Sequence, residues 1–152
     1  MPVVDKFIDV VSGPEPIWEI IRQQEHFPDF MTDVESVKVT ATKQIPGSRN
    51  WETTSAWETS IDGTPILWIE KDNFYPDQFR ITYQLIEGDL DKFEGDWQID
   101  VQPDGTCRVT LKVDYDFGIP ELAQLIGPTL EQKVGENSEM MLKAIKDKVE
   151  AA

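Results

Sequence analysis

Trp68, Glu70 and Asp72 are the residues of this sequence whose types and spacing best suit proton-transfer chemistry. They lie two residues apart, so in a β-strand their side chains all point to one face of the sheet. If that face is buried, desolvation disfavours the ionised carboxylate and raises the pKa of each acid towards neutrality. Two carboxyl groups in different surroundings can then act as proton donor and proton acceptor. The alternatives are that both acids lie at a solvated rim of the sheet, or that a β-bulge turns them outwards.

The scarcity of cysteine and histidine excludes most familiar catalytic centres. Cys107 and His26 are the single residues of their types, so a zinc site with nitrogen and sulfur ligands is not expected. The alternation of apolar and polar residues after Cys107 indicates a buried strand position, and His26 is expected at the surface or at a helix cap. The sequence contains neither a phosphate-binding loop nor a dinucleotide-binding motif. We therefore expect no metal ion and no cofactor.

Length and charge limit the architecture and the partners. A chain of 152 residues is near the commonest domain size, and residues 1–152 are expected to form a single domain. Its 14 basic and 29 acidic residues give a formal net charge of −15, which disfavours binding to nucleic acid or to an anionic membrane surface. No apolar run reaches the roughly 18 residues of a membrane span, and no secretory signal is evident. The expected state is a cytoplasmic monomer or homodimer.

The hydrophobic pattern predicts an α+β fold. A first strand at Val3–Val11 precedes two short helical segments, at Pro14–Gln24 and at residues 26–31. Six alternating segments follow between Val34 and Phe117, separated by turn signals such as Asp62-Gly63. When the first strand joins these segments, they form a seven-stranded antiparallel sheet.

The final segment, Pro120–Ala151, has the apolar spacing of a long helix. One helix cannot cover a large and strongly bent sheet completely, so the arrangement predicts a cavity that holds an apolar molecule. Asn137 is the polar residue on the apolar stripe of this helix, and its buried amide must bond to a ligand, an ordered water or a sheet carbonyl. The stripe itself comprises Leu122, Ile126, Leu130, Val134, Met141 and Ile145.

Four of the five tryptophans are expected to wall this cavity. Trp51 and Trp57 are six residues apart on one strand and therefore share a face, while Trp68 and Trp97 lie on later strands. Flat apolar walls with indole N–H donors suit a planar, oxygenated ligand; ordinary core packing is the alternative. The further residues expected to contact the ligand are Phe30 and Met31, which would close one end of the cavity, Tyr115 and Met141.

Several segments resemble the polyketide cyclase/dehydrase family of the START and Bet v 1-like helix-grip superfamily. These are Tyr83–Gly88, Phe93–Trp97 and Val113–Phe117, and the stretch from Trp51 to Trp68 is most similar to bacterial aromatase/cyclases. The resemblance implies a helix-grip fold, in which the sheet curves around the long C-terminal helix. It also implies aldol ring closure and dehydration of a poly-β-ketone, without a cofactor, on a substrate delivered by an acyl carrier protein.

One departure from the aromatase/cyclases concerns their arginines. Where those enzymes carry an arginine after the interior tryptophan, this sequence has Glu70 and Asp72, and Gln84 stands where some members have a second arginine. The leading hypothesis is therefore a cyclase in which Asp72 and Glu70 transfer protons while Gln84 and Asn137 orient carbonyl groups. A carrier protein is itself acidic, so docking would need a basic patch, for which the candidates are Arg49, Lys71, Arg80 and Lys92.

Two other functions use the same fold. The first is a non-enzymatic carrier or sensor of a quinone, a lipid or another apolar molecule, as in the coenzyme Q-binding members of the superfamily. It needs the same pocket but no proton-transfer pair. The second is a protein-interaction module like the ribosome-associated members, which fits poorly with so acidic a chain. The orientation of Glu70 and Asp72 distinguishes an enzyme from a carrier.

Overall fold

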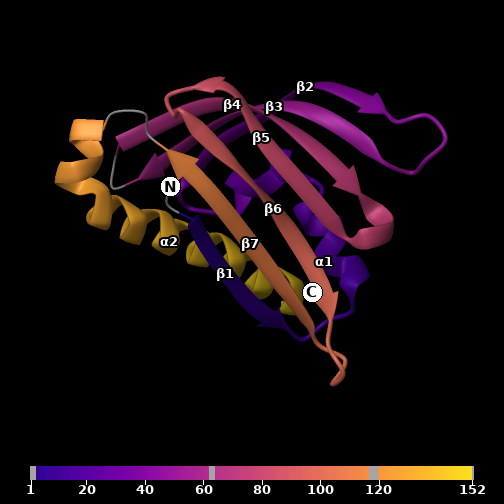
Figure 1. Cartoon of the computed structure of the whole chain (residues 1–152). Coiled ribbons are helices and arrows are strands. Elements are labelled where there is room, and N and C mark those ends of the chain that lie inside the picture. The colour runs from indigo at the N-terminus through magenta and orange to yellow at the C-terminus, as the bar shows by residue number, and fades with distance from the viewer. Residues whose placement is uncertain (1–2, 62–63, 117–119, 152) are drawn as a thin grey trace.

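One long helix lies across the concave face of a curved seven-stranded antiparallel sheet (Figure 1). The computed structural model describes residues 3–61, 64–116 and 120–151, with the backbone alone for Ile61, Thr64 and residues 120–130. In chain order the elements are β1 (Val3–Val10), α1 (Pro14–Ile21), the 3-10 helix η1 (Gln24–Asp29), β2 (Val34–Gln44), β3 (Trp51–Ile61), β4 (Thr64–Tyr75), the 3-10 helix η2 (Pro76–Gln78), β5 (Arg80–Gly88), β6 (Lys92–Val101), β7 (Cys107–Asp116) and α2 (Pro120–Glu150).

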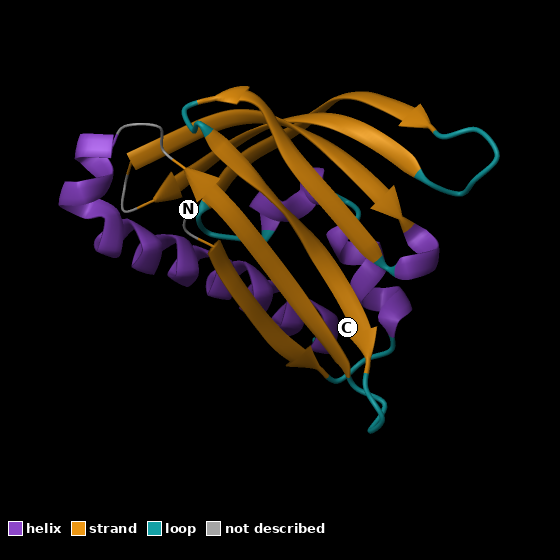
Figure 2. Cartoon of the chain, in the orientation of Figure 1, coloured by secondary structure: helices purple, strands orange, loops and turns teal. Residues whose placement is uncertain are grey.

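The strand order confirms the helix-grip architecture expected from the sequence. The sheet runs β1-β7-β6-β5-β4-β3-β2, so each strand from β2 to β7 pairs with the next and β1 closes the series beside β7. Figure 2 shows the helices gathered on the concave side of this sheet. The predicted Asp62-Gly63 turn and the side chains of Leu122, Ile126 and Leu130 lie outside the described residues.

Regular pairing between β3 and β4 determines which side chains face α2. Trp57 is opposite Trp68, Ser55 is opposite Glu70, and Thr53 is opposite Asp72, with no irregularity anywhere along this pair of strands. The register shifts that do occur place their extra residues on β2 and β5. Because β4 carries no bulge, the alternation of its side chains is unbroken, and the face of Trp68 is also the face of both acids.

Aromatic packing fills the end of the concave face that α1 covers. Two prolines in its first turn begin α1, and its Trp18 meets Trp51 of β3 edge to face, with ring centroids 6.2 Å apart. Trp51 in turn stacks on Phe74 of β4 at 4.7 Å. Phe27 of η1 continues the packing against Trp57, at 6.0 Å. The short helices therefore close one end of the sheet and leave the other end to α2.

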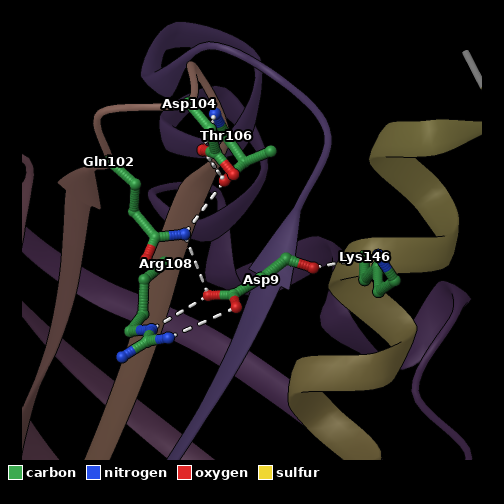
Figure 3. A network of polar contacts seen from close by, with 6 residues as sticks. All are labelled: Asp9, Gln102, Asp104, Thr106, Arg108 and Lys146. Atoms are coloured by element: carbon green, nitrogen blue, oxygen red, sulfur yellow. Dashed lines mark hydrogen bonds and ion pairs between the residues drawn. The ribbon is translucent and has the colours of Figure 1, made fainter.

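A polar network fixes the C-terminal part of α2 to the edge strand (Figure 3). The Asp9 carboxylate on β1 accepts hydrogen bonds from Arg108 Nε on β7, at 2.9 Å, and from Gln102 after β6, at 3.2 Å. Its backbone carbonyl accepts a bond from Lys146 Nζ on α2, also at 2.9 Å. Since Asp9 joins the neighbouring strand β7, the turn after β6 and the helix, it holds α2 in place over the sheet.

Gly95 of β6 allows an unusually close approach of three strands. It lies between Tyr83 of β5 and Val113 of β7, and the Tyr83 hydroxyl passes over it to donate a 2.6 Å hydrogen bond to the carbonyl of Lys112. A Cβ atom at position 95 would overlap that carbonyl oxygen and lie 2.7 Å from the Tyr83 hydroxyl. A glycine is therefore required where Tyr83, a neighbour of the two buried acids, reaches across the sheet.

We expect Gly95→Ala to lower the free energy of unfolding by about 1–3 kcal/mol, the usual cost of forcing an extra carbon into a packed site. Gly135→Ala on α2 is the matched control, because its Cβ would lie 3.4 Å from the flexible end of Lys6 and alanine favours helix. Urea denaturation should show a loss for the first variant and no loss for the second. Equal stability of both variants would contradict the close approach.

Candidate functional site

A cavity of about 60 Å³ lies between the concave face of the sheet and α2. Its volume has room for a few water molecules, so a larger ligand must displace side chains of the wall. The lining residues are Trp57, Thr59, Ile66, Trp68, Glu70, Tyr83, Leu90, Phe93, Trp97, Leu111, Val113, Tyr115, Val134, Asn137, Ser138 and Met141.

Glu70 is the acid of the cavity wall, and Asp72 lies directly behind it. The Glu70 side chain is 3% exposed, and its Oε1 atom accepts a 2.7 Å hydrogen bond from the indole Nε1 of Trp68. Asp72 is fully buried and does not line the cavity. Its Oδ2 atom accepts hydrogen bonds from Ser55 at 2.6 Å and from Thr53 at 3.1 Å. Asp72 thus accepts more hydrogen bonds from protein donors than Glu70 does, although it is the more deeply buried of the two.

The second oxygen of Asp72 has no hydrogen-bond donor among the described residues. This atom, Oδ1, is buried, and the Glu70 carboxyl group is its acidic neighbour. Two adjacent carboxylates in a dry interior cannot both be ionised. Burial, and then the charge of Asp72, raise the pKa of Glu70 well above its ordinary value. Glu70 is therefore the acid that the fold holds more strongly in its protonated form.

Burial also raises the pKa of Asp72, but the hydrogen bonds from Glu70, Ser55 and Thr53 oppose this shift. Three donors on one carboxyl group favour its charged form. These hydrogen bonds make Asp72 the more acidic member of the pair.

A continuous set of hydrogen bonds connects this pair to two stacked tryptophans. Trp57 Nε1 donates to Ser55 Oγ at 2.8 Å, and Ser55 then donates to Asp72. The rings of Trp57 and Trp68 stack with centroids 5.7 Å apart and planes 10° from parallel. The Trp68 indole N–H therefore donates directly to Glu70, and the Trp57 indole N–H is connected to Asp72 through Ser55.

The other polar groups at the cavity are uncharged. Asn137 of α2 presents a buried Nδ2 donor that has no acceptor among the described residues. Burial raises the pKa of Tyr115 to about 12, which keeps its hydroxyl neutral. Ser138 donates to the Val134 carbonyl one turn earlier in the helix. No lysine or arginine is among the described lining residues.

The structure brings seven of the residues singled out in the sequence together around the cavity: Trp57, Trp68, Glu70, Trp97, Tyr115, Asn137 and Met141. Asp72 touches Glu70 but not the cavity. Trp51 faces the same side as Trp57, as its spacing implies, but Trp18 and Phe74 cover it. Strand alternation determines the side of the sheet that a side chain faces. Whether other residues pack over that side chain depends on contacts between segments that are distant in the sequence.

Three other expectations differ from the observed positions. Gln84 is exposed on the outer face of β5, because it is paired with the outward-facing Lys71 of β4. Met31 is buried in the core without lining the cavity. Phe30 lies in a surface groove beside α2, where Lys148 Nζ is 5.2 Å from its ring centroid. Phe27 of η1 packs against Trp57 and Trp97 of the cavity wall without lining the cavity itself.

Ser55 and Thr53 were not apparent as functional residues from the sequence. The signal that could have found them is the hairpin between β3 and β4, since pairing Ile61 with Thr64 places Ser55 opposite Glu70 and Thr53 opposite Asp72. Their small hydroxyl side chains then become the donors that two buried acids require.

Each proposed basic docking residue is already paired with an acid. Arg49 pairs with Asp77, Lys71 with Glu52, Arg80 with Asp96, and Lys92 with Asp114. These pairs cancel the positive charge that would attract an acidic carrier protein. Within the described residues, no group of three or more His, Cys, Asp or Glu side chains could hold a metal ion. None of the described helices is both long and apolar enough to cross a bilayer.

The family model for polyketide cyclase/dehydrase and lipid transport proteins matches residues 13–142. The chain belongs to this family. No curated protein is similar enough in sequence to count as a relative. The family includes both enzymes and lipid transport proteins, so membership alone does not identify the reaction.

Solved structures of this family and its superfamily share the fold. The protein TTHA0849 from Thermus thermophilus has 26% identity and a TM-score of 0.87, over 99% of this chain and 98% of that one. The Zhui aromatase/cyclase from Streptomyces sp. R1128 has 18% identity and a TM-score of 0.82, over 98% and 93%. A START superfamily protein from Mycobacterium smegmatis has 22% identity and a TM-score of 0.80, over 98% and 97%.

The buried acid pair should make the stability of this family member depend on pH in a distinctive way. Because the folded state raises the pKa of Glu70, it binds more protons than the unfolded state once the pH exceeds the ordinary glutamate value of 4.5. Stability contributed by Glu70 is therefore complete below that value and is lost as the pH rises towards the folded pKa. Glu70→Gln keeps the shape without the titration, so it should become progressively more stable relative to the wild type over the same interval.

The measurement is urea denaturation at a series of pH values from about 4 to 8, with the difference between variant and wild type plotted against pH. Glu58→Gln, on the outer face of β3, controls for the general effect of removing one carboxylate. A difference for Glu70→Gln that does not change with pH would contradict a proton held on Glu70.

Proposed function

We propose that this protein catalyses aldol ring closure and dehydration of a poly-β-ketone, with Glu70 as the residue that transfers protons. The observation that carries the proposal is a buried carboxyl group of raised pKa on the wall of an aromatic cavity, with a second buried carboxyl group behind it. Membership of the cyclase/dehydrase family and the fold shared with an aromatase/cyclase support it. Acid–base chemistry without a cofactor needs no further group.

The acid pair can transfer protons in both ring closure and dehydration without a net change in its own protonation. In the first step the enol carbon of one β-diketone unit attacks a distant ketone carbon. Glu70 gives its proton to that ketone oxygen, and the enol O–H returns a proton to the pair. In the second step the pair takes a proton from the carbon beside the new hydroxyl and passes a proton to the departing oxygen, which leaves as water. The pair holds one proton before and after.

The roles of the two acids differ from the simplest expectation that both act on the substrate. Glu70 is in position to touch a ligand, whereas Asp72 reaches it only through Glu70. Asp72 is therefore a positioning residue, which holds the Glu70 proton and accepts it when Glu70 recovers one from the substrate. Asn137, on the opposite wall, is placed to donate to a substrate carbonyl. The stacked Trp57 and Trp68 rings supply a flat wall for a folded chain.

Entry of a substrate requires the cavity to widen. Met141 and Phe93 are among its lining residues, and a methionine adapts its shape at low cost. An acyl carrier protein is the proposed source of the substrate. Since the four candidate docking cations are all ion-paired, the proposal for the chemistry does not depend on docking through them.

The second candidate is a carrier of an apolar molecule without chemistry. The observation that favours it is the small and mainly apolar cavity of about 60 Å³, together with the lipid transport proteins in the same family. The acid pair favours the enzyme, because a carrier gains nothing from the cost of burying two carboxyl groups. Turnover measurements separate the two functions.

Glu70→Gln is expected to lower turnover by about 10²–10⁴-fold, the usual contribution of general acid–base catalysis. A suitable probe is heptane-2,4,6-trione, in which a bond between the first and sixth carbons and loss of one water give 5-methylbenzene-1,3-diol. Glutamine can still accept from Trp68 and donate to Asp72, so the fold should be kept. Formation of the aromatic product is followed by its ultraviolet absorbance at neutral pH.

Asp72→Asn should shift the pH profile of the same reaction, because asparagine removes the charge that holds the Glu70 proton. Its effect should not add to that of Glu70→Gln, since the two residues act as a unit. Gln84→Ala, on the outer face of β5, is the matched control and should retain the wild-type rate. Wild-type turnover in Glu70→Gln, or no turnover by the wild type above the uncatalysed rate, would contradict the enzymatic proposal.

A further inference from the structure

Among the described residues, the cavity has an unpaired hydrogen-bond donor on one wall and free acceptor lone pairs on the other. On α2, the Asn137 Nδ2 atom is a buried donor that lacks an acceptor among the described residues. On β4, the Glu70 carboxyl group lines the cavity and keeps free lone pairs, since Oε1 accepts one bond, from Trp68. The two walls therefore require opposite partners, which are an acceptor for Asn137 and a donor for Glu70.

The charged groups near the cavity are equally one-sided. Its wall holds the carboxyl group of Glu70 with that of Asp72 buried behind it, and the described lining residues include no cation. A carboxylate placed in this cavity would lose its hydration, gain no counterion and lie beside two acidic side chains. A neutral carbonyl group would suffer none of these penalties.

We propose that the cavity selects an uncharged aromatic or enolic ligand that offers a carbonyl acceptor to Asn137 and a hydroxyl donor to Glu70, and that it excludes the corresponding carboxylates. The inference rests on the proposed function only in using the same cavity for the ligand. An enolised β-diketone and a phenolic ketone both satisfy this pattern. The carboxylic acid formed by hydrolysis of a thioester does not satisfy this pattern, because it is an anion at neutral pH.

The shape of the wall agrees with a planar ligand. Trp57 and Trp68 are nearly parallel, and Phe93 is tilted by 52° to Trp68 at 4.8 Å. Trp97 lies further along the same face, against Phe27. A single aromatic ring that displaces Met141 can pack against these rings while its substituents reach towards the two polar walls.

Equilibrium dialysis with three single-ring probes tests this selectivity at about pH 6.5. The probes are 3-hydroxyacetophenone, which has both donor and acceptor, acetophenone, which lacks the donor, and 3-hydroxybenzoate, which replaces the ketone by a carboxylate. We expect the hydroxyketone to bind about 5- to 10-fold more tightly than acetophenone, the worth of one hydrogen bond. We expect it to bind at least about 100-fold more tightly than the benzoate.

Variants assign the selectivity to the two walls. Asn137→Leu should weaken binding of the hydroxyketone by about 5- to 10-fold. Gln84→Ala, outside the cavity, should leave all three affinities unchanged. Equal affinity for hydroxyketone and benzoate, or no binding of either, would overturn the inference. If Glu70→Gln loses turnover but the wild type binds hydroxyketone and benzoate equally well, the inference alone is overturned. If the wild type shows the binding selectivity but no turnover, the enzymatic proposal alone is overturned.

Discussion

The pairing of β3 with β4 is the constraint on which the site depends. Two carboxyl groups are buried on β4, opposite Ser55 and Thr53 of β3. Both β3 hydroxyl groups donate hydrogen bonds to Asp72, and Glu70 accepts one from Trp68. A buried carboxylate without donors would cost several kcal/mol. The same register stacks Trp57 on Trp68. A slip of one residue would turn all of these side chains to the outer face.

The second consequence of this pairing is electrostatic. Hydroxyl and indole donors surround the acid pair, and no described lining residue supplies a positive charge, so the cavity keeps an acidic wall. The resemblance to aromatase/cyclases implied arginines in this region, and this sequence has Glu70 and Asp72 there instead. A cationic site stabilises a developing oxyanion, whereas a protonated acid donates to the same oxygen. The chemistry proposed here is the second kind.

Much of this arrangement followed from the sequence because it depends on local rules. Alternation along β4 predicted that Trp68, Glu70 and Asp72 share a face, and the order of turns predicted the sheet. The position of Asp72 behind Glu70 could not be predicted, because depth depends on how β4 and α2 diverge. Trp51 had the correct face, but Trp18 covers it through a contact between distant segments. Gln84 was placed by family resemblance rather than by alternation with its buried neighbour Tyr83, and it lies on the opposite face.

The most direct test of the account is the protonation state of Glu70 itself. Carbon-13 NMR of the side-chain carboxyl carbons, assigned with Glu70→Gln, reports the pKa of this residue without reference to activity or ligand. The account predicts a Glu70 resonance that remains in its protonated position at neutral pH, with a pKa well above 4.5 that falls, while staying raised by burial, when Asp72→Asn removes the adjacent charge. A Glu70 resonance that titrates at the ordinary glutamate value would contradict the central claim.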